Sequence, residues 1–284
     1  MDTRTLAAKA ERLRQLHHGP HLLVLPNAWD VASARILEEM GFPAIATGSA
    51  GVAAVLGYPD GQRIPRGEML DMVARIARAV RVPVTADMES GYGTTAEDAA
   101  RLAKELIAAG AVGLNYEDVT GDNESSHVEL GLQTEKLRKL REASDSLGVP
   151  LVINARTDIY LLPIGPESTR FERTVERLRA YREAGADCLF APGVGDPALI
   201  ARLVRALQGP LNILVSAPGC PSLPELEKLG VARASFGSSA MRAALGTLRR
   251  VAREALDTGT YKCLRDGIVP YDELQRILAR PASA

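Results

Sequence analysis

The sequence lacks the features on which binding to nucleic acids or membranes depends. Its 284 residues include 34 basic and 35 acidic ones, which leaves a formal net charge of -1. This balance gives no strong positive field of the kind that attracts nucleic acid or an anionic membrane. No apolar run is long enough for a transmembrane helix. We therefore expect neither nucleic acid nor membrane as a partner.

Cysteine is also scarce. Cys188, Cys220 and Cys263 are an odd number without the spacing of a metal site, and no signal peptide is visible at the amino terminus. These absences favour a reduced protein, and we expect the chain to be cytoplasmic.

The chain has no phosphate-loop motif, no dinucleotide-binding motif and no Ser/Gly-rich linker. Instead, short apolar runs alternate with segments of helical period, which is typical of a parallel sheet with crossover helices. Strands are expected at 22–25, 44–47, 82–86, 112–116, 151–155, 188–191, 212–215 and 233–236. Helices are expected at 3–17 and near 30–40, 66–80, 95–109, 133–147, 169–184, 196–207, 222–229 and 238–257.

Eight such units in succession predict a (β/α)₈ TIM barrel as a single domain over residues 1–284, with an extra amino-terminal helix and a carboxyl-terminal helical appendage over 259–284. Periodicity alone leaves the doubly wound open sheet as an alternative. Helix ends agree with the barrel, since Gly41, Gly110, Gly148, Gly185 and Gly230 each follow a periodic run, where a left-handed cap favours glycine. Thr94 and Glu97 suggest a capping box for the third barrel helix.

Polar residues follow the expected strands, at the barrel face where functional groups gather. The most informative segment is Asp87-Met88-Glu89-Ser90-Gly91-Tyr92-Gly93. In an extended strand end, Asp87 and Glu89 point to the same side, so two hard oxygen donors converge. Mg²⁺ prefers such ligands, and Asp60 and Glu117 could join through water. For any one of these carboxylates, a surface group at the start of a loop is the favoured interpretation. The convergence of four on one barrel mouth favours a site instead.

Two further segments suit the binding of an anionic substrate. Arg156 follows an apolar strand, where its guanidinium can hold a carboxylate at two points and stabilise charge on a neighbouring oxygen. A structural ion pair with Asp158 or Glu117 is the alternative and is compatible with this role. The turn at Gly48, Ser49 and Ala50 can present N–H groups and a hydroxyl to an oxyanion.

In this order, the motifs resemble those of the isocitrate lyase/phosphoenolpyruvate mutase superfamily, and the likeness covers nearly the whole chain. The matching segments are Pro26-Asn27-Ala28-Trp29-Asp30-Val31-Ala32-Ser33-Ala34, Gly48-Ser49-Ala50, Leu56-Gly57-Tyr58-Pro59-Asp60, the Asp87 to Gly93 segment, Glu117-Asp118 and Asn154-Ala155-Arg156-Thr157-Asp158.

The resemblance implies a Mg²⁺ or Mn²⁺ ion bound by Asp87 and, largely through waters, by Asp60, Glu89 and Glu117. It implies a small carboxylic acid substrate that chelates the metal, with Arg156 and the turn at residues 48–50 binding its other oxygens. It also implies a homo-oligomer, a dimer of dimers that exchanges its last barrel helix.

The sequence departs from the family pattern where proton transfer is expected. Lyases of the family carry a catalytic Cys in a loop, and Ser125 stands at that place. Phosphonopyruvate enzymes of the family place Lys directly after the Glu-Asp pair, where this chain has Val119. His127 is the remaining titratable candidate in the loop, with an exposed histidine without catalytic duty as the alternative.

The candidate catalytic set is therefore Arg156, His127, Ser125 and Glu117. Substrate binding is assigned to Trp29, Gly48, Ser49, Ala50, Asp60, Tyr92 and Asn212, with a packing role as the alternative for Trp29 and Tyr92. The resemblance implies a Mg²⁺-dependent C–C lyase or decarboxylase for a small 2-hydroxy or 2-oxo acid, such as a substituted malate or an oxaloacetate-like acid. A P–C bond enzyme and a non-catalytic 2-oxo acid binding protein are the alternatives.

Overall fold

Short parallel strands form the centre of the molecule, as the alternation of apolar runs predicts. The computed structural model describes residues 2–120 and 127–279. Its strands are β1 (Leu23–Leu25), β2 (Asn27–Ala28), β3 (Ile45–Thr47), β4 (Val84–Asp87), β5 (Gly113–Glu117), β6 (Val152–Arg156), β7 (Cys188–Phe190), β8 (Leu211–Leu214) and β9 (Arg233–Ser235). They pair in the order β1-β9-β8-β7-β6-β5-β4-β3-β2.

The sheet closes on itself through a single interrupted strand. Only Pro26 separates β1 from β2, yet β1 pairs with β9 and β2 pairs with β3. Proline has no N–H to give to a neighbouring strand, so the hydrogen-bond ladder changes partner there. The two ends of the sheet thus belong to one stretch of chain. This closure confirms the barrel and excludes the open doubly wound sheet.

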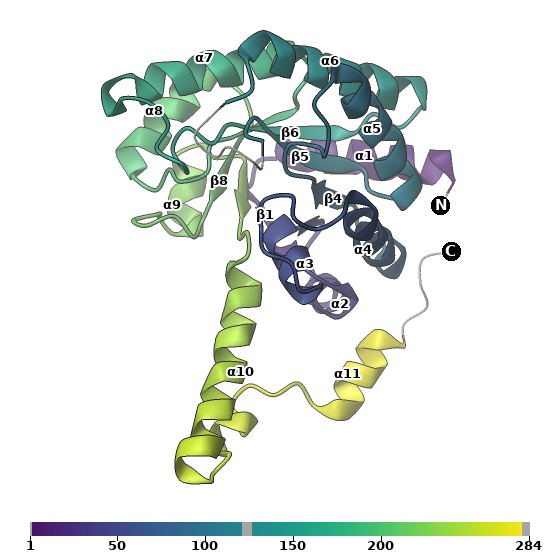
Figure 1. Ribbon diagram of the computed structural model, residues 1–284, viewed down its shortest axis with the longest axis vertical. Coiled ribbons are helices and arrows are strands. Elements are labelled where there is room, and N and C mark those ends of the chain that lie inside the picture. Colours follow the sequence, from purple (N-terminus) through teal and green to yellow (C-terminus); the bar gives the residue numbers. More distant parts are fainter. Residues whose placement is uncertain (1, 121–126, 280–284) are drawn as a thin grey trace.

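Helices follow the strands along the chain, and Figure 1 shows all but the last two as an outer layer around the barrel. They are α1 (Thr3–His17), α2 (Val31–Glu39), α3 (Ser49–Val55), α4 (Arg66–Ala79), α5 (Ala96–Ala109), α6 (Leu130–Ser146), α7 (Arg170–Glu183), α8 (Pro197–Leu207), α9 (Leu223–Lys228), α10 (Ser239–Thr258) and α11 (Tyr271–Leu278), with short 3₁₀ turns η1 (Glu167–Thr169) and η2 (Lys262–Arg265). Their apolar faces bury a core of aliphatic side chains against the strands.

The helix ends follow the predicted pattern with one correction. Gly41, Gly110, Gly148, Gly185 and Gly230 all have positive φ, which confirms them as left-handed residues at helix ends. The capping box of α5 lies one residue later than the predicted pair of Thr94 and Glu97. The box is formed by Thr95 and Asp98, whose side chains each accept a hydrogen bond from the other's backbone N–H. The sequence offers two overlapping pairs here, and spacing alone does not choose between them.

One helix of the structure was not expected from the sequence, and another begins earlier than expected. Helix α3 was not predicted, because its seven residues are all small or apolar and show no polar face. It begins in the turn at residues 48–50, so this turn is the start of a helix. Helix α6 begins at Leu130, three residues before the expected start, because the Glu129 side chain caps it by accepting from the N–H of Leu132 at 2.9 Å.

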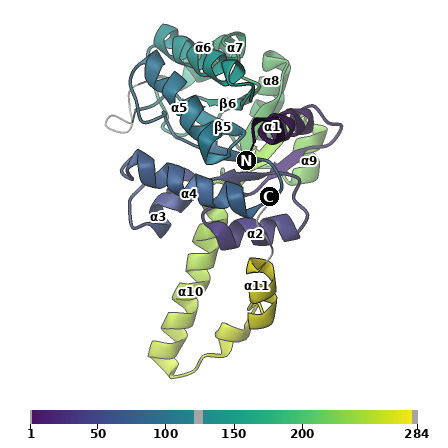
Figure 2. The same cartoon turned by 90° about the vertical axis from the view of Figure 1, so that its right-hand side faces the viewer.

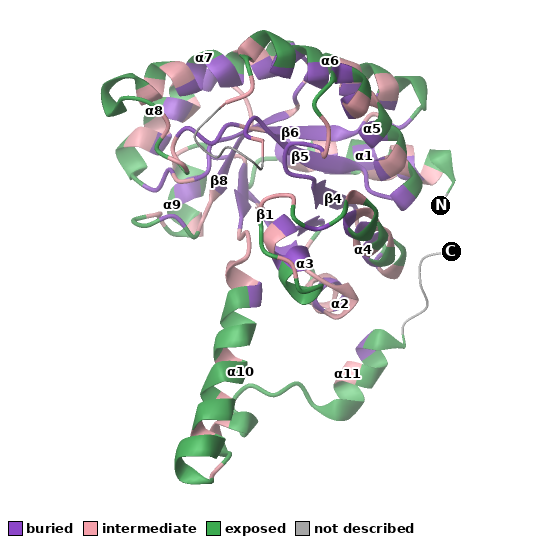
Figure 3. Ribbon diagram, viewed as in Figure 1, coloured by how far each residue is buried: buried purple, intermediate pink, exposed green. Residues whose placement is uncertain are grey.

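The last helices stand away from the barrel. Figure 2 shows α10 extending outward and α11 lying beside α2 on the return. Arg35 donates to the Ile277 carbonyl at 3.1 Å, and Arg276 pairs with Glu39 at 2.8 Å, so α11 is attached to its own barrel. Most of α10 is exposed in Figure 3, and Met241 is its single buried residue. Within the described residues, no helix is both long enough and apolar enough to cross a membrane.

Candidate active site

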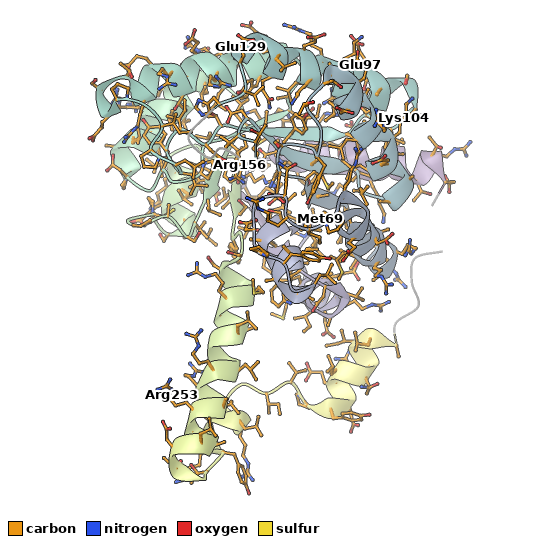
Figure 4. The ribbon with its side chains drawn as sticks, in the orientation of Figure 1. Met69, Glu97, Lys104, Glu129, Arg156 and Arg253 are labelled. Atoms are coloured by element: carbon orange, nitrogen blue, oxygen red, sulfur yellow. The ribbon has the colours of Figure 1, made fainter. Side chains whose placement is uncertain are left out.

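A cavity of about 170 Å³ opens at the carboxyl ends of the strands. It is smaller than the roughly 300 to 1,000 Å³ typical of sites for drug-sized ligands, so it suits a compact ligand. Its described lining consists of Ser49, Asp60, Gly61, Glu89, Glu117, Val119, Thr120, Arg156, Asp158, Leu161 and Leu162. Figure 4 shows Arg156 among the side chains inside the ring of helices.

Asp87 ends β4 directly beside this cavity. Its Oδ2 atom accepts hydrogen bonds from the backbone N–H and the hydroxyl of Ser49, at 3.2 and 3.1 Å. The backbone N–H of Asp87 donates to the Thr47 hydroxyl at 3.0 Å, which fixes the end of the strand. Its Oδ1 atom is buried without a hydrogen-bond partner among the described residues. A buried carboxylate oxygen without a partner is costly, and a cation would compensate for it.

Glu89 reaches the site through a turn, which corrects the expectation of an extended strand end. Strand β4 stops at Asp87, and Glu89 has a φ of +50° in the left-handed region. The turn closes when the N–H of Gly91 donates to the Met88 carbonyl at 2.9 Å. A tight turn lets the Glu89 carboxylate approach Asp87 and the cavity, where a longer strand would carry it past the barrel mouth.

The Glu89 carboxylate is held by two donors and lies among other negative charges. Its Oε2 accepts from the backbone N–H of Gln62 at 2.7 Å, and its Oε1 from the Tyr92 hydroxyl at 3.3 Å. Burial raises the pKa of Glu89 to about 7, and the charges of Asp87 and Asp60 add to this rise. Carboxylates that repel each other in this way form a place that a cation would stabilise.

Glu117, Arg156 and Asp158 form a buried ion-pair cluster on the next two strands. Arg156 Nη1 lies 2.7 Å from Glu117 Oε2. Its Nε and Nη2 atoms donate to the two oxygens of Asp158 at 2.6 and 2.9 Å. Burial raises the pKa of Glu117 well above its ordinary value, although the charge of Arg156 opposes the rise. The Arg156 pKa is raised because Asp158 and Glu117 outweigh the effect of burial.

The oxygen donors fit a hard divalent cation such as Mg²⁺. Two observations support this: Asp87 Oδ1 has no hydrogen-bond partner among the described residues, and the charges of Asp87 and Asp60 both act on Glu89. In the described part of the chain, no three His, Cys, Asp or Glu residues are grouped closely enough to hold an ion by themselves. Mg²⁺ commonly binds through one or two carboxylates and completes its shell with water or substrate oxygens.

Some of the residues that were expected to bind the substrate line the cavity, and others do not. Ser49 and Asp60 line the cavity, whereas Trp29, Gly48, Ala50, Tyr92 and Asn212 are outside its described lining. Trp29 packs against α3 so closely that a Cβ at Gly51 would lie 3.0 Å from the Trp29 Cβ. Asn212 is fully buried in the barrel interior and donates to Ser235 at 3.2 Å.

Of the loop candidates, His127 is described by the structure and is not among the described residues that line the cavity. Ser125 lies outside the described residues. His127 forms an antiparallel bridge with Val119, and its ring is buried, with Nε2 3.8 Å from Asp118 Oδ1. Burial lowers the His127 pKa, although Asp118 opposes this. The other oxygen of Asp118 accepts from Arg177 at 2.9 Å and from Tyr181 at 2.6 Å, so His127 adjoins a structural cluster.

The sequence did not indicate Gln62, nor the two leucines of the cavity lining, Leu161 and Leu162. The Gln62 backbone binds Glu89, while its side chain donates to Ser90 at 2.6 Å and accepts from the N–H of Tyr92 at 2.8 Å. The adjacent Asp60-Gly61 pair signals a turn, yet no pattern identifies a residue that acts partly through its backbone. Leu161 and Leu162 lack any polar signal.

Comparisons with known proteins agree with the fold and the motifs. The phosphoenolpyruvate phosphomutase family matches residues 13–256. A crystal structure from Burkholderia cenocepacia, provisionally described as a lyase or mutase, has a TM-score of 0.91 and 38% identity and covers 98% of both chains. The structure of oxaloacetate acetylhydrolase with its product oxalate has a TM-score of 0.84 and 28% identity, covering 96% of this chain and 94% of its own.

Among curated proteins, an oxaloacetate decarboxylase of Bradyrhizobium diazoefficiens is 30% identical over 270 residues, which are 93% of this chain and 87% of that protein. The family match spans most of the barrel and includes Asp87, Glu117 and Arg156. The chain therefore belongs to the phosphoenolpyruvate phosphomutase family, within the isocitrate lyase/phosphoenolpyruvate mutase superfamily of lyases and mutases.

Proposed function

We propose that the chain is a Mg²⁺-dependent C–C bond lyase or decarboxylase for a small 2-hydroxy or 2-oxo carboxylic acid and that it works through an enolate. One observation carries the proposal: a small cavity joins the buried carboxylates of Glu89 and Glu117 to the guanidinium of Arg156, beside an unpartnered oxygen of Asp87.

Asp87 would hold the ion directly, with Asp60, Glu89 and Glu117 acting largely through water. Bound there, Mg²⁺ would act as a Lewis acid that polarises the substrate's 2-oxygen. Ser49 orients Asp87 through two hydrogen bonds, which leaves Oδ1 for the ion. Gln62 and Tyr92 hold Glu89 in a fixed position near the same point.

Arg156 would bind the substrate's oxygens and stabilise the negative charge that develops as the bond breaks. Its two ion pairs fix the guanidinium before substrate arrives, so little reorganisation is needed during the reaction. Arg156 lines the same cavity as Asp60 and Ser49, so all three could contact one small acid.

Carbon–carbon chemistry is known among the relatives, alongside the phosphorus–carbon chemistry for which the family is named. The relatives described above include proteins named for oxaloacetate decarboxylation and oxaloacetate hydrolysis, both of which break a C–C bond. Decarboxylation of a 2-oxo acid with a 3-carboxylate needs an electron sink at the 2-oxygen, which the metal and Arg156 would supply. It does not require a protein base to start bond breaking.

Turnover with Mg²⁺ on a panel of 2-hydroxy and 2-oxo di- and tricarboxylates tests the proposal. We expect activity on at least one acid, its loss with EDTA, its return with Mg²⁺, and its loss in Asp87→Asn. Asp71→Asn on the exposed face of α4 is the matched control. Release of inorganic phosphate from phosphonopyruvate would favour a P–C enzyme, and tight oxalate binding without turnover would favour a binding protein. Turnover that persists in Asp87→Asn would overturn the metal role.

We also propose that α10 packs against a second copy of the chain in a homo-oligomer. Helix α10 extends from the barrel in both views (Figures 1 and 2) and exposes large apolar side chains, namely Leu245 at 52%, Leu248 at 63% and Leu256 at 86%. Exposed apolar side chains in such number along one helix are typical of an interface. A second copy, with α10 helices exchanged between barrels, would cover them.

A further inference from the structure

A fully buried carboxylate adjoins the ion-pair cluster of Arg156. Asp118 directly follows Glu117, the last residue of β5, and has no exposed surface. Its Oδ2 atom accepts hydrogen bonds from Nε of Arg177 at 2.9 Å and from the Tyr181 hydroxyl at 2.6 Å. Both donors belong to α7, which lies in the outer layer of helices (Figure 1). We name Asp118, Arg177 and Tyr181 the Asp118 cluster.

The other oxygen of Asp118 holds the backbone of Asp158. The N–H of Asp158 donates to Asp118 Oδ1 at 3.2 Å. Asp158 is also the residue whose carboxylate accepts from Nε and Nη2 of Arg156. The two oxygens of Asp118 therefore join α7 on one side to the main chain that carries the partner of Arg156 on the other.

Asp158 needs such a partner because the chain leaves the sheet there. The preceding residue, Thr157, still donates its N–H to the carbonyl of Phe190 on the neighbouring strand, at 2.9 Å. For the N–H of Asp158 the Asp118 carboxylate takes the place of a strand carbonyl. A charged acceptor forms a stronger hydrogen bond than a carbonyl does. Arg177 supplies the opposite charge that a buried carboxylate requires.

We infer that Asp118 is a positioning residue for Arg156: held by Arg177 and Tyr181, it fixes the backbone at Asp158 and thereby the direction of the guanidinium. The inference rests on the proposed function, because Arg156 is the group that would bind the substrate's oxygens. Asp118 is not among the described residues that line the cavity, so it acts without touching the substrate. Its position matters because a displacement of about 1 Å in a site can cost about 100-fold in rate.

A double-mutant cycle tests whether the Asp118 cluster acts through Arg156. Oxalate is the probe, and calorimetry in the presence of Mg²⁺ gives its Kd. Tyr181→Phe removes one hydrogen bond to Asp118 and should weaken oxalate binding about fivefold. In an Arg156→Lys background, which lacks the fork, the same substitution should weaken it less than about twofold. Tyr58→Phe, which removes a hydroxyl that donates to the Glu68 carboxylate at 2.9 Å, is the control and should have no effect.

The outcomes separate this inference from the proposed function. Equal weakening by Tyr181→Phe in both backgrounds, or no weakening at all, would overturn the positioning role and leave the proposed function standing. Failure of the wild-type chain to bind oxalate with Mg²⁺ would overturn the proposed metal and acid site, and the inference with it. Asp118→Asn is a second variant of nearly equal size, and circular dichroism verifies that each variant folds. Its single oxygen cannot accept on both sides, so it should show the same dependence on Arg156.

Discussion

Arg156 binds both carboxylate oxygens of Asp158, only two residues further along the chain, at 2.6 and 2.9 Å. A two-point ion pair of this kind requires the planar fork of a guanidinium, which an ammonium group cannot reproduce. The same guanidinium reaches Glu117 at 2.7 Å, so one side chain joins the ends of β5 and β6 at the cavity.

Replacement of Arg156 by lysine tests this geometry. We expect Arg156→Lys to lower kcat/KM by about 100-fold or more, because a single donor replaces the fork that stabilises developing charge. Steady-state kinetics on the substrate found in the panel, with circular dichroism to verify folding, gives the measurement. Arg101→Lys, at an exposed pair with Asp98, should leave the kinetics unchanged. Wild-type activity in Arg156→Lys would contradict a role for the fork.

Metal binding should be visible as thermal stability. A ligand that binds only the folded state at 100 times its Kd adds about 2.7 kcal/mol. For a chain of this size we therefore expect Mg²⁺ to raise the Tm by several degrees, measured by differential scanning fluorimetry, and EDTA to reverse the rise. Asp87→Asn should abolish the Mg²⁺-dependent shift, while Asp71→Asn should retain it. The same shift in wild type and Asp87→Asn would place the ion elsewhere.

Gln62 should strengthen Mg²⁺ binding indirectly, because it holds Glu89 in position. Removing the Gln62 amide frees Ser90 and Tyr92, the residues that follow Glu89 in its turn. We expect Gln62→Ala to weaken Mg²⁺ binding by about 10-fold, as is usual when a residue that orients a ligand is lost. Isothermal titration with Mg²⁺ measures this, with Gln15→Ala on α1 as the control. An unchanged Mg²⁺ affinity would limit Gln62 to packing.

The stability of the fold should fall in acid because of His17. Burial, with the charge of Arg233, lowers the His17 pKa to about 4, against about 6.5 in an unfolded chain. Between these values the unfolded chain binds a proton that the folded chain does not, so stability decreases as the pH falls. From this residue we expect a loss of about 3 kcal/mol in the free energy of unfolding between pH 7 and pH 4.

Chemical denaturation at pH 7, 5.5 and 4 measures this loss. His17→Leu should flatten the dependence across this range, whatever its effect on stability at pH 7. His18→Gln, at the exposed neighbouring position, should keep the wild-type dependence. An unaltered dependence in His17→Leu would assign the acid sensitivity to other groups.

The exposed face of α10 should decide the oligomeric state. We expect Leu248→Glu to shift the chain toward smaller assemblies, because a buried carboxylate at an apolar interface is strongly unfavourable. Size-exclusion chromatography with light scattering gives the mass. Leu147→Glu, an exposed leucine at the end of α6, is the control. A monomeric wild-type chain, or an unchanged mass in Leu248→Glu, would contradict the proposed packing.

The barrel could be predicted from the sequence because each strand–helix unit repeats the same local signals. Gly110 and Gly185, for example, mark helix ends through a backbone conformation that favours glycine wherever it occurs. Helix α3 escaped prediction because a short stretch of small residues has no polar face, and tertiary packing against Trp29 decides its conformation.

The sequence indicates candidate site residues where the proposed function depends on the charge of a side chain. Asp87, Glu89 and Arg156 are conspicuous as ionisable groups directly after apolar strands. Gln62 could not be found in this way, because it contributes partly through its backbone N–H and comes from a loop distant in sequence. The proposed role of His127 stays a prediction, since the structure buries its ring beside Asp118.

The left-handed backbone at Glu89 lowers the stability of the fold, yet the proposed metal site requires a carboxylate at this position. Glycine or asparagine would adopt a φ of +50° with less steric strain, which is on the order of 1 kcal/mol or more for other residues. Neither supplies a carboxylate. Selection of variants for heat resistance alone should therefore drift toward Gly or Asn at residue 89, and the more stable barrels that result should bind the proposed ion less tightly.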